Sequence, residues 1–334
     1  MSERQSSSLA KLVGGAVKAT VAVAGVTVGA VAVSNAVISG RTPQLSPRLG
    51  GQFGRYPARF GDVSYTVAGT GSPVLLLHGL DAGRSMAEWR GLFDLLADEH
   101  TVYAFDWLGW GLSDAAQNGY DHTGFAEIVR DFIHDIIQKP TMVVAAGQGA
   151  IFAVLAASGN PEISGLALIC PVPPAHDQPS GQSRAEAMMG GALLGGVLNA
   201  PLFGTAAVNW LRSRAQLAAW ATEHGFTNPE RAEQEVNTLY VSAHQDPAGY
   251  GLRAFLQGNF EGDWRDAWSR LEIPALLIWG RDALREGFDS SPEWLALQPR
   301  ATLEVVENTR LLPHLEAPAS VASLLGSWLN SAPE

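Results

Sequence analysis

From about residue 60 onward, short apolar runs alternate along the chain with segments whose apolar positions have helical spacing. One such helical segment is 125–136, in which the apolar side chains fall on one face. Seven runs have the length and composition of strands: residues 62–68, 73–77, 101–105, 142–146, 166–170, 275–279 and 302–306. Strands that alternate with helices predict a doubly wound, mostly parallel sheet.

A long stretch between Pro171 and Pro274 breaks this alternation. It is rich in Ala, Gly, Leu and Trp and has helix and loop signals but no strand. An insertion that follows one strand and precedes the next predicts a helical lid over the carboxyl ends of the strands, where ligands bind in such sheets. We therefore expect a core formed by residues 60–171 and 272–331, and a lid formed by residues 172–271.

The N-terminal region has a different pattern. Residues 19–40 carry no charged side chain, and an apolar helix of about 20 residues spans a bilayer. The pattern predicts a transmembrane or signal-anchor helix, with residues 1–18 as a tail and 41–59 as a linker. Two alternatives stay open: a cleaved signal peptide, since Ala30-Val31-Ala32 resembles a cleavage site, and a soluble tail.

An anchored protein would be membrane-associated with a single span. Basic residues flank the run on both sides, so its orientation is not fixed by the positive-inside rule. Gly25 and Gly29 form a GxxxG motif, which lets two helices approach closely and indicates a possible homodimer.

Composition narrows the classes of partner and cofactor. Hydrophobic residues make up 46% of the chain, and the net charge is -11 with no block of Lys or Arg, so nucleic acid is not an expected partner. Cys170 is the only cysteine, which excludes an internal disulfide. The sequence has no metal-ligand cluster, phosphate loop or dinucleotide fingerprint, so we expect no cofactor.

Several motifs resemble those of the α/β-hydrolase superfamily, in order and at plausible spacing. They are His78-Gly79-Leu80, Asp106 to Asp114 (DWLGWGLSD), Ala145 to Gly149 (AAGQG), and the pair Trp279 to Asp282 (WGRD) with Leu312 to Pro318 (LPHLEAP). The resemblance covers about residues 60–331 and is nearest to the lidded, esterase-like subgroup. It implies an oxyanion loop, an acid-bearing turn, a nucleophile elbow, and acid and histidine loops.

The elbow departs from the family pattern, which is small-x-nucleophile-x-small. Ala145 and Gly149 supply the small residues, which puts Gly147 at the nucleophile position. A frame shifted by one residue puts Gln148 there. Neither side chain can attack a carbonyl, because that step needs Ser, Cys or Asp.

The resemblance also indicates that the acid and the base are lost. The family's acid lies three residues after the glycine of the Trp-Gly pair, which is Ala283, and its histidine falls at Leu311. The fallback candidates are Asp282, one residue early, and His314, where the family often has a structural histidine. His78 is a third candidate base.

The resemblance implies that the oxyanion hole is kept. Its donors, here called the cradle, are the backbone N–H groups of Leu80 and Gln148, which in the family stabilise a developing negative charge. Gly79, Trp107 and Trp110 complete the expected ligand-binding residues. We expect Asp106 to cap its turn.

Two hypotheses about function follow. The first is a membrane-tethered pseudoenzyme that binds a small, apolar, carbonyl- or acid-bearing ligand or a protein partner. The noncatalytic N-myc downstream-regulated family, whose elbow looks similar, offers a precedent. The second is an enzyme that still turns over, either esterase-like or nucleophile-independent with His78 or His314 as the base. A base within hydrogen-bond reach of the cradle distinguishes the second from the first.

Overall fold

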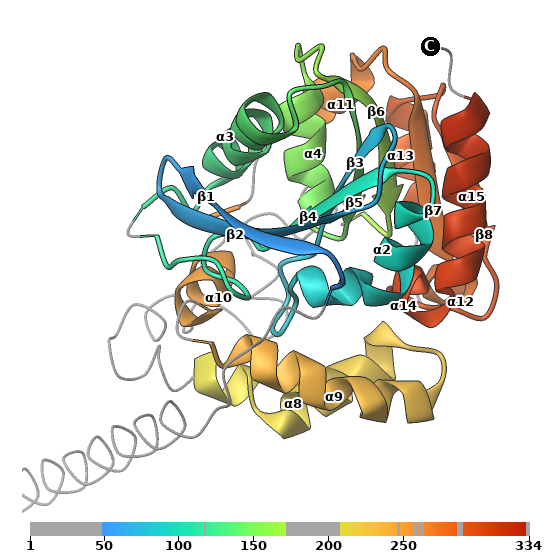
Figure 1. Ribbon diagram of the computed structural model, residues 1–334. Coiled ribbons are helices and arrows are strands. Elements are labelled where there is room, and N and C mark those ends of the chain that lie inside the picture. Colours follow the sequence, from blue (N-terminus) through green and yellow to red (C-terminus); the bar gives the residue numbers. More distant parts are fainter. Residues whose placement is uncertain are drawn as a thin grey trace, which may run out of the picture.

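The computed structural model describes residues 49–116, 118–171, 208–245, 248–256, 259–260, 264–285 and 290–331. An eight-stranded sheet lies at its centre, in the spatial order β1-β2-β4-β3-β5-β6-β7-β8 (Figure 1). The strands are β1 (Gln52–Ala58), β2 (Gly61–Ala68), β3 (Pro73–Leu77), β4 (Thr101–Phe105), β5 (Thr141–Ala146), β6 (Ile163–Ile169), β7 (Ala275–Gly280) and β8 (Thr302–Val306).

The sheet is mostly parallel, as the alternating pattern predicted. Only β1 with β2 and β2 with β4 pair in the antiparallel direction. The other pairs are parallel. Every residue of β3, β5 and β7 is buried, because helices cover both faces of a parallel sheet.

The covering helices form two groups. On one face α2 (Arg90–Ala97) packs against α15 (Pro318–Ser331), and on the other α3 (His122–Phe132) packs against α4 (Gly149–Ala157) (Figure 1). Shorter elements complete the core: η1 (Met86–Trp89), η2 (Ile133–Ile137), α12 (Arg281–Arg285), α13 (Ser291–Leu297) and α14 (Pro313–Glu316).

Most of the described residues between β6 and β7 are helical. They form α8 (Arg214–Trp220), η4 (Ala221–Gly225), α9 (Pro229–Ala243), α10 (Ala248–Leu256) and α11 (Arg265–Ser269). In Figure 1, α8 and α9 lie beyond one end of the sheet. Ser85 Oγ, in the loop after β3, lies 3.1 Å from Ser242 Oγ of α9, and Arg90 pairs with Glu235 of the same helix. α9 therefore contacts a loop at the carboxyl ends of the strands.

One expectation about the N-terminal region was wrong. Residues 41–59 were predicted as a linker, but 52–58 form β1 at the edge of the sheet. The Pro, Gly and Arg content of this segment is typical of a linker. Here Pro57 is tolerated because the strand lies at the edge of the sheet, and Arg55 forms an ion pair with Asp62 of β2 at 3.3 Å. The predicted span 19–40, with Gly25 and Gly29, lies outside the described residues. Within the described ranges no helix is both long and apolar enough to cross a bilayer.

Candidate functional site

The turn between β5 and α4 has two glycines in very different environments. Gly147 has a φ of +54°, and within the described ranges a Cβ built on it would come within 4 Å of only one atom, the Cα of Gly79 at 3.8 Å. A Cβ on Gly149 would lie 2.7 Å from the carbonyl oxygen of His78, so only glycine fits there. The left-handed backbone and the open space at Gly147 favour it over Gln148, whose φ is -67°, as the position equivalent to the nucleophile.

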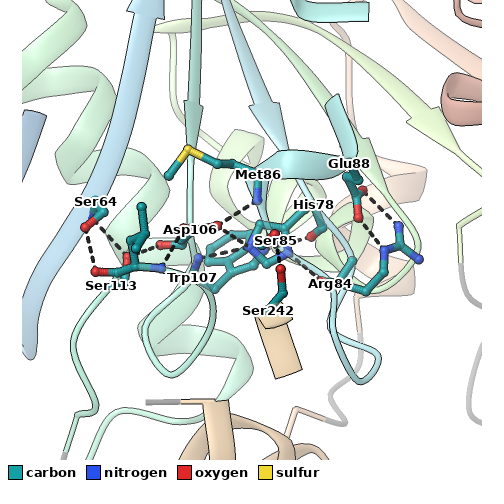
Figure 2. Close-up of polar contacts among 12 residues, drawn as sticks. Ser64, His78, Arg84, Ser85, Met86, Glu88, Asp106, Trp107, Ser113 and Ser242 are labelled. Atoms are coloured by element: carbon teal, nitrogen blue, oxygen red, sulfur yellow. Dashed lines mark hydrogen bonds and ion pairs between the residues drawn. The ribbon is translucent and has the colours of Figure 1, made fainter. Parts of the chain in front are cut away.

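His78 is fixed in one tautomer by the backbone around it (Figure 2). Its Nδ1 lies 2.6 Å from the carbonyl oxygen of Gly79, which only accepts, so Nδ1 carries the proton. Its Nε2 accepts from the backbone N–H of Trp107 at 3.2 Å. With both nitrogens engaged and the side chain fully buried, His78 has no free lone pair for a substrate proton.

Asp106 holds the turn that follows β4, as expected. Its carboxylate accepts from the backbone N–H of Met86 at 2.6 Å and of Leu112 at 2.8 Å (Figure 2). Burial raises the pKa of this carboxyl to about 7 despite the two donors. Asp106 therefore joins the start of η1 to the turn after β4.

A buried ion pair that the motifs did not indicate lies beside the oxyanion loop. The guanidinium of Arg84 packs on the backbone of Gly79, since a Cβ there would lie 3.0 Å from its Cζ. Arg84 donates to both carboxylate oxygens of Glu88, with Nη2 2.8 Å from Oε1 (Figure 2). The guanidinium holds the pKa of Glu88 well below its usual range although burial opposes this. The sequence signal for this ion pair was the presence of opposite charges at Arg84 and Glu88, four residues apart.

His314 joins this pair from the histidine loop. Its Nε2 lies 3.3 Å from Oε1 of Glu88, without the alignment of a hydrogen bond, and its ring packs 4.5 Å from that of Trp89. Burial, helped by the nearby Arg84, lowers the pKa of His314. The histidine is fully buried and faces Glu88, so its described contacts give it a structural environment.

The positions that resemble the family's acid and base are apolar and packed. Ala283 is fully buried, and Leu311 is half-buried against the main core. Asp282, the fallback acid, accepts from the hydroxyl of Thr227 at 3.0 Å. Through this bond Asp282 contacts the segment between β6 and β7.

The two tryptophans of the expected ligand-binding set lie inside the protein. Trp107 stacks on Phe125 with ring centres 5.0 Å apart, and its Nε1 donates to the carbonyl oxygen of His78. Trp110 packs under the backbone of Gly251 in α10. Leu80 and Gly79 are buried in the oxyanion loop, and Gln148 is half-buried at the start of α4.

The buried His78 leads to a prediction for stability against pH. Burial lowers its pKa to about 4, whereas the unfolded chain titrates near 6.5. The stabilisation from the neutral ring is therefore complete above about pH 6.5 and is lost as pH falls toward 4. We expect the stability advantage of the wild type over His78→Gln to shrink by about 2–3 kcal/mol between pH 7.5 and 4.5 in urea unfolding.

Asp106 contributes to the pH dependence of stability with the opposite sign, because its raised pKa favours the folded state as pH falls. Asp106 is present in both the wild type and His78→Gln, so the difference in their unfolding free energies removes this contribution. Glutamine keeps one donor and one acceptor but does not titrate. A difference between the two that stays constant across this pH range would contradict the assigned environment of His78.

These features define a mostly parallel α/β fold with an elbow, an oxyanion loop and an intervening helical segment. The model of the alpha/beta hydrolase family matches residues 74–324, and the chain belongs to this family.

Characterised relatives are similar over most of the chain. The (E)-2-((N-methylformamido)methylene)succinate hydrolase of Acinetobacter baylyi is 23% identical over 80% of this chain and 94% of its own length. The structure of Cfl2 from Burkholderia cenocepacia has a TM-score of 0.69 at 20% identity and covers 85% of this chain and 98% of its own. A membrane phospholipase A has a TM-score of 0.62 at 22% identity and covers 98% of both chains. At these identities the solved structures bear on the fold alone.

Proposed function

We propose that this protein is a noncatalytic, membrane-tethered member of the α/β hydrolase family that binds a small ligand or a protein partner through the former active site. The observation that carries the proposal is Gly147. It occupies the strained elbow with space for a side chain, yet it has none. An acyl-transfer enzyme needs a nucleophile at this point.

The surrounding histidines also support a loss of chemistry. A general base must reach the proton it removes, and both ring nitrogens of His78 are engaged by backbone groups. His314 is turned toward Glu88 and Trp89. These contacts weigh against the alternative, a nucleophile-independent enzyme that uses His78 or His314 as its base.

The charges near the site bear on the class of ligand. The guanidinium of Arg84 is matched by Glu88, and burial lowers the pKa of both His78 and His314, which keeps their rings neutral. A carboxylate ligand would thus find no uncompensated cation in this cluster. We favour a neutral, apolar ligand with a carbonyl that accepts from the backbone N–H groups of Leu80 and Gln148.

A fluorophosphonate probe tests the absence of a nucleophile. We expect no increase in intact mass after prolonged incubation of the purified wild type, because no side chain from Ala145 to Ala150 can be phosphonylated. An active serine esterase in the same reaction is the positive control. A stoichiometric adduct mapped to the pocket would mean that another residue acts as nucleophile.

The tether rests on the charge-free run 19–40. The segment between β6 and β7 is proposed to act as the lid over the former active site, since α9 contacts the loop after β3.

The tether predicts fractionation behaviour. The full chain is expected to stay in the membrane pellet through an alkaline carbonate wash, whereas a Val26→Lys, Val28→Lys variant should be released, because a charged residue at mid-span costs about 2.5–3.5 kcal/mol. Sequencing the N-terminus of the membrane form is the control. A mature N-terminus near Val33, or release of the intact wild type by the wash, would contradict the anchor.

A further inference from the structure

Two large aromatic side chains are exposed on neighbouring helical segments of the proposed lid. Trp210 is 53% exposed and Tyr250 is 62% exposed. The segments that carry them pack against each other, because Val208 forms a small apolar cluster with Leu252 and Leu256 of α10. The two exposed aromatic side chains therefore belong to segments that pack against each other.

Two arginines and the buried His244 lie near Tyr240, and a Cβ built on Gly249, the neighbour of Tyr250, would lie 3.5 Å from Arg212 Nη1. The guanidinium of Arg214 lies 4.2 Å from the centre of the Tyr240 ring, and the His244 ring lies 4.1 Å from it. Arg212 donates through Nη1 to the carbonyl oxygen of Ala243 at 2.9 Å. The six residues Trp210, Arg212, Arg214, Tyr240, His244 and Tyr250 are called the lid patch below.

The arginines of the lid patch have no carboxylate partner among the residues that the structure describes. Arg214 bonds to the amide oxygen of Asn237, and Arg212 contacts that of Asn209. Most other described arginines pair with a carboxylate: Arg55, Arg59, Arg84, Arg90, Arg265, Arg270 and Arg281. Burial lowers the pKa of His244, and the charges of Arg212 and Arg214 contribute. Arg212 and Arg214 therefore carry positive charge that no described carboxylate offsets by direct pairing, in a chain of net charge -11.

We propose that the lid patch docks on the surface of an anionic lipid bilayer. Trp and Tyr favour the membrane–water interface, where the ring is buried and its polar atom stays hydrated. The exposed Arg214 gains electrostatic attraction near an anionic leaflet, and its guanidinium matches phosphate geometry. Arg212 is largely buried and donates to Ala243 and Asn209, so it contributes its charge rather than a direct contact. The proposal rests on the proposed tether only in that the tether keeps the lid close to a membrane.

The test follows a probe next to the lid patch in the full chain. Ala215, an exposed neighbour of Arg214, is changed to Cys and labelled with an environment-sensitive fluorophore, while the native Cys170 is buried. The protein is reconstituted into vesicles of phosphatidylcholine alone or mixed with phosphatidylglycerol. We expect a blue shift of emission in the anionic vesicles only, and its reversal by high salt.

Matched variants assign the shift to the patch. Arg212→Glu with Arg214→Glu should abolish it, whereas Arg270→Glu, an exposed arginine on another surface, should leave it unchanged. A label at exposed Ser323→Cys on α15 should not respond. Circular dichroism confirms that each variant folds.

Three results would overturn the docking proposal. They are an equal response in both lipids, a shift that survives in the double variant, and a shift produced by soluble heparin but not by anionic vesicles. The last would indicate a soluble polyanionic partner. Failure of the tether is distinguishable, because it appears as loss of the protein from the vesicle pellet, independent of the probe.

Discussion

A Glu88→Gln variant is expected to lose about 3–5 kcal/mol of unfolding free energy, which is the usual cost of removing one partner of a buried ion pair. Arg84 is fully buried, and Glu88 is the carboxylate that accepts its Nε and Nη2 donors. Glutamine has nearly the same shape but no charge, so the buried guanidinium would keep only the more distant carboxylate of Asp81, 3.8 Å from Nη1, among its described charged partners. Urea unfolding at neutral pH measures the loss.

An exposed ion pair in the same chain is the control. Arg270 and Asp266 lie 2.8 Å apart with both side chains more than half exposed, and Asp266→Asn should cost less than about 1 kcal/mol. If Glu88→Gln costs no more than this control, the ion pair does not have the buried environment described here.

The largest expected effect on activity comes from rebuilding the catalytic groups. The triple change Gly147→Ser, Ala283→Asp and Leu311→His should hydrolyse a short chromogenic ester at least about 10²-fold faster than Gly147→Ser alone, because a positioned base contributes about 10²–10⁴. The donors on Leu80 and Gln148 remain in place to stabilise the tetrahedral intermediate.

Each variant needs a check of folding, because Ala283 is fully buried and an aspartate there must find a partner. A triple variant that folds but is no faster than the single one would contradict the assignment of Ala283 and Leu311 to the acid and base positions.

The parallel core was predictable because its strands are short apolar runs bounded by turns. The run 73–77 became β3 without change of bounds, and 302–306 became β8. β1 pairs with β2, the next segment along the chain, but part of what holds it is distant in sequence, as the ion pair of Arg55 with Asp114 shows. Local composition favoured a linker there.

The site was predictable in outline but not in its contacts. Motif spacing placed Gly147 and Gly149, because the sharp turn from strand to helix restricts which residues fit. Spacing could not reveal that the backbone engages both nitrogens of His78, or that Arg84 lies over Gly79. Those contacts depend on how loops far apart in sequence pack together.

The most direct test of the central claim is the ester hydrolysis rate of the single variant Gly147→Ser. The space around Gly147 admits a side chain, and a φ of +54° costs a non-glycine residue only about 1–3 kcal/mol, so the variant should fold. We expect no turnover above the wild type, because a serine hydroxyl needs an adjacent base and the described contacts of His78 and His314 engage both rings elsewhere. Turnover by this variant alone would show that a base is already in place and would contradict the noncatalytic assignment.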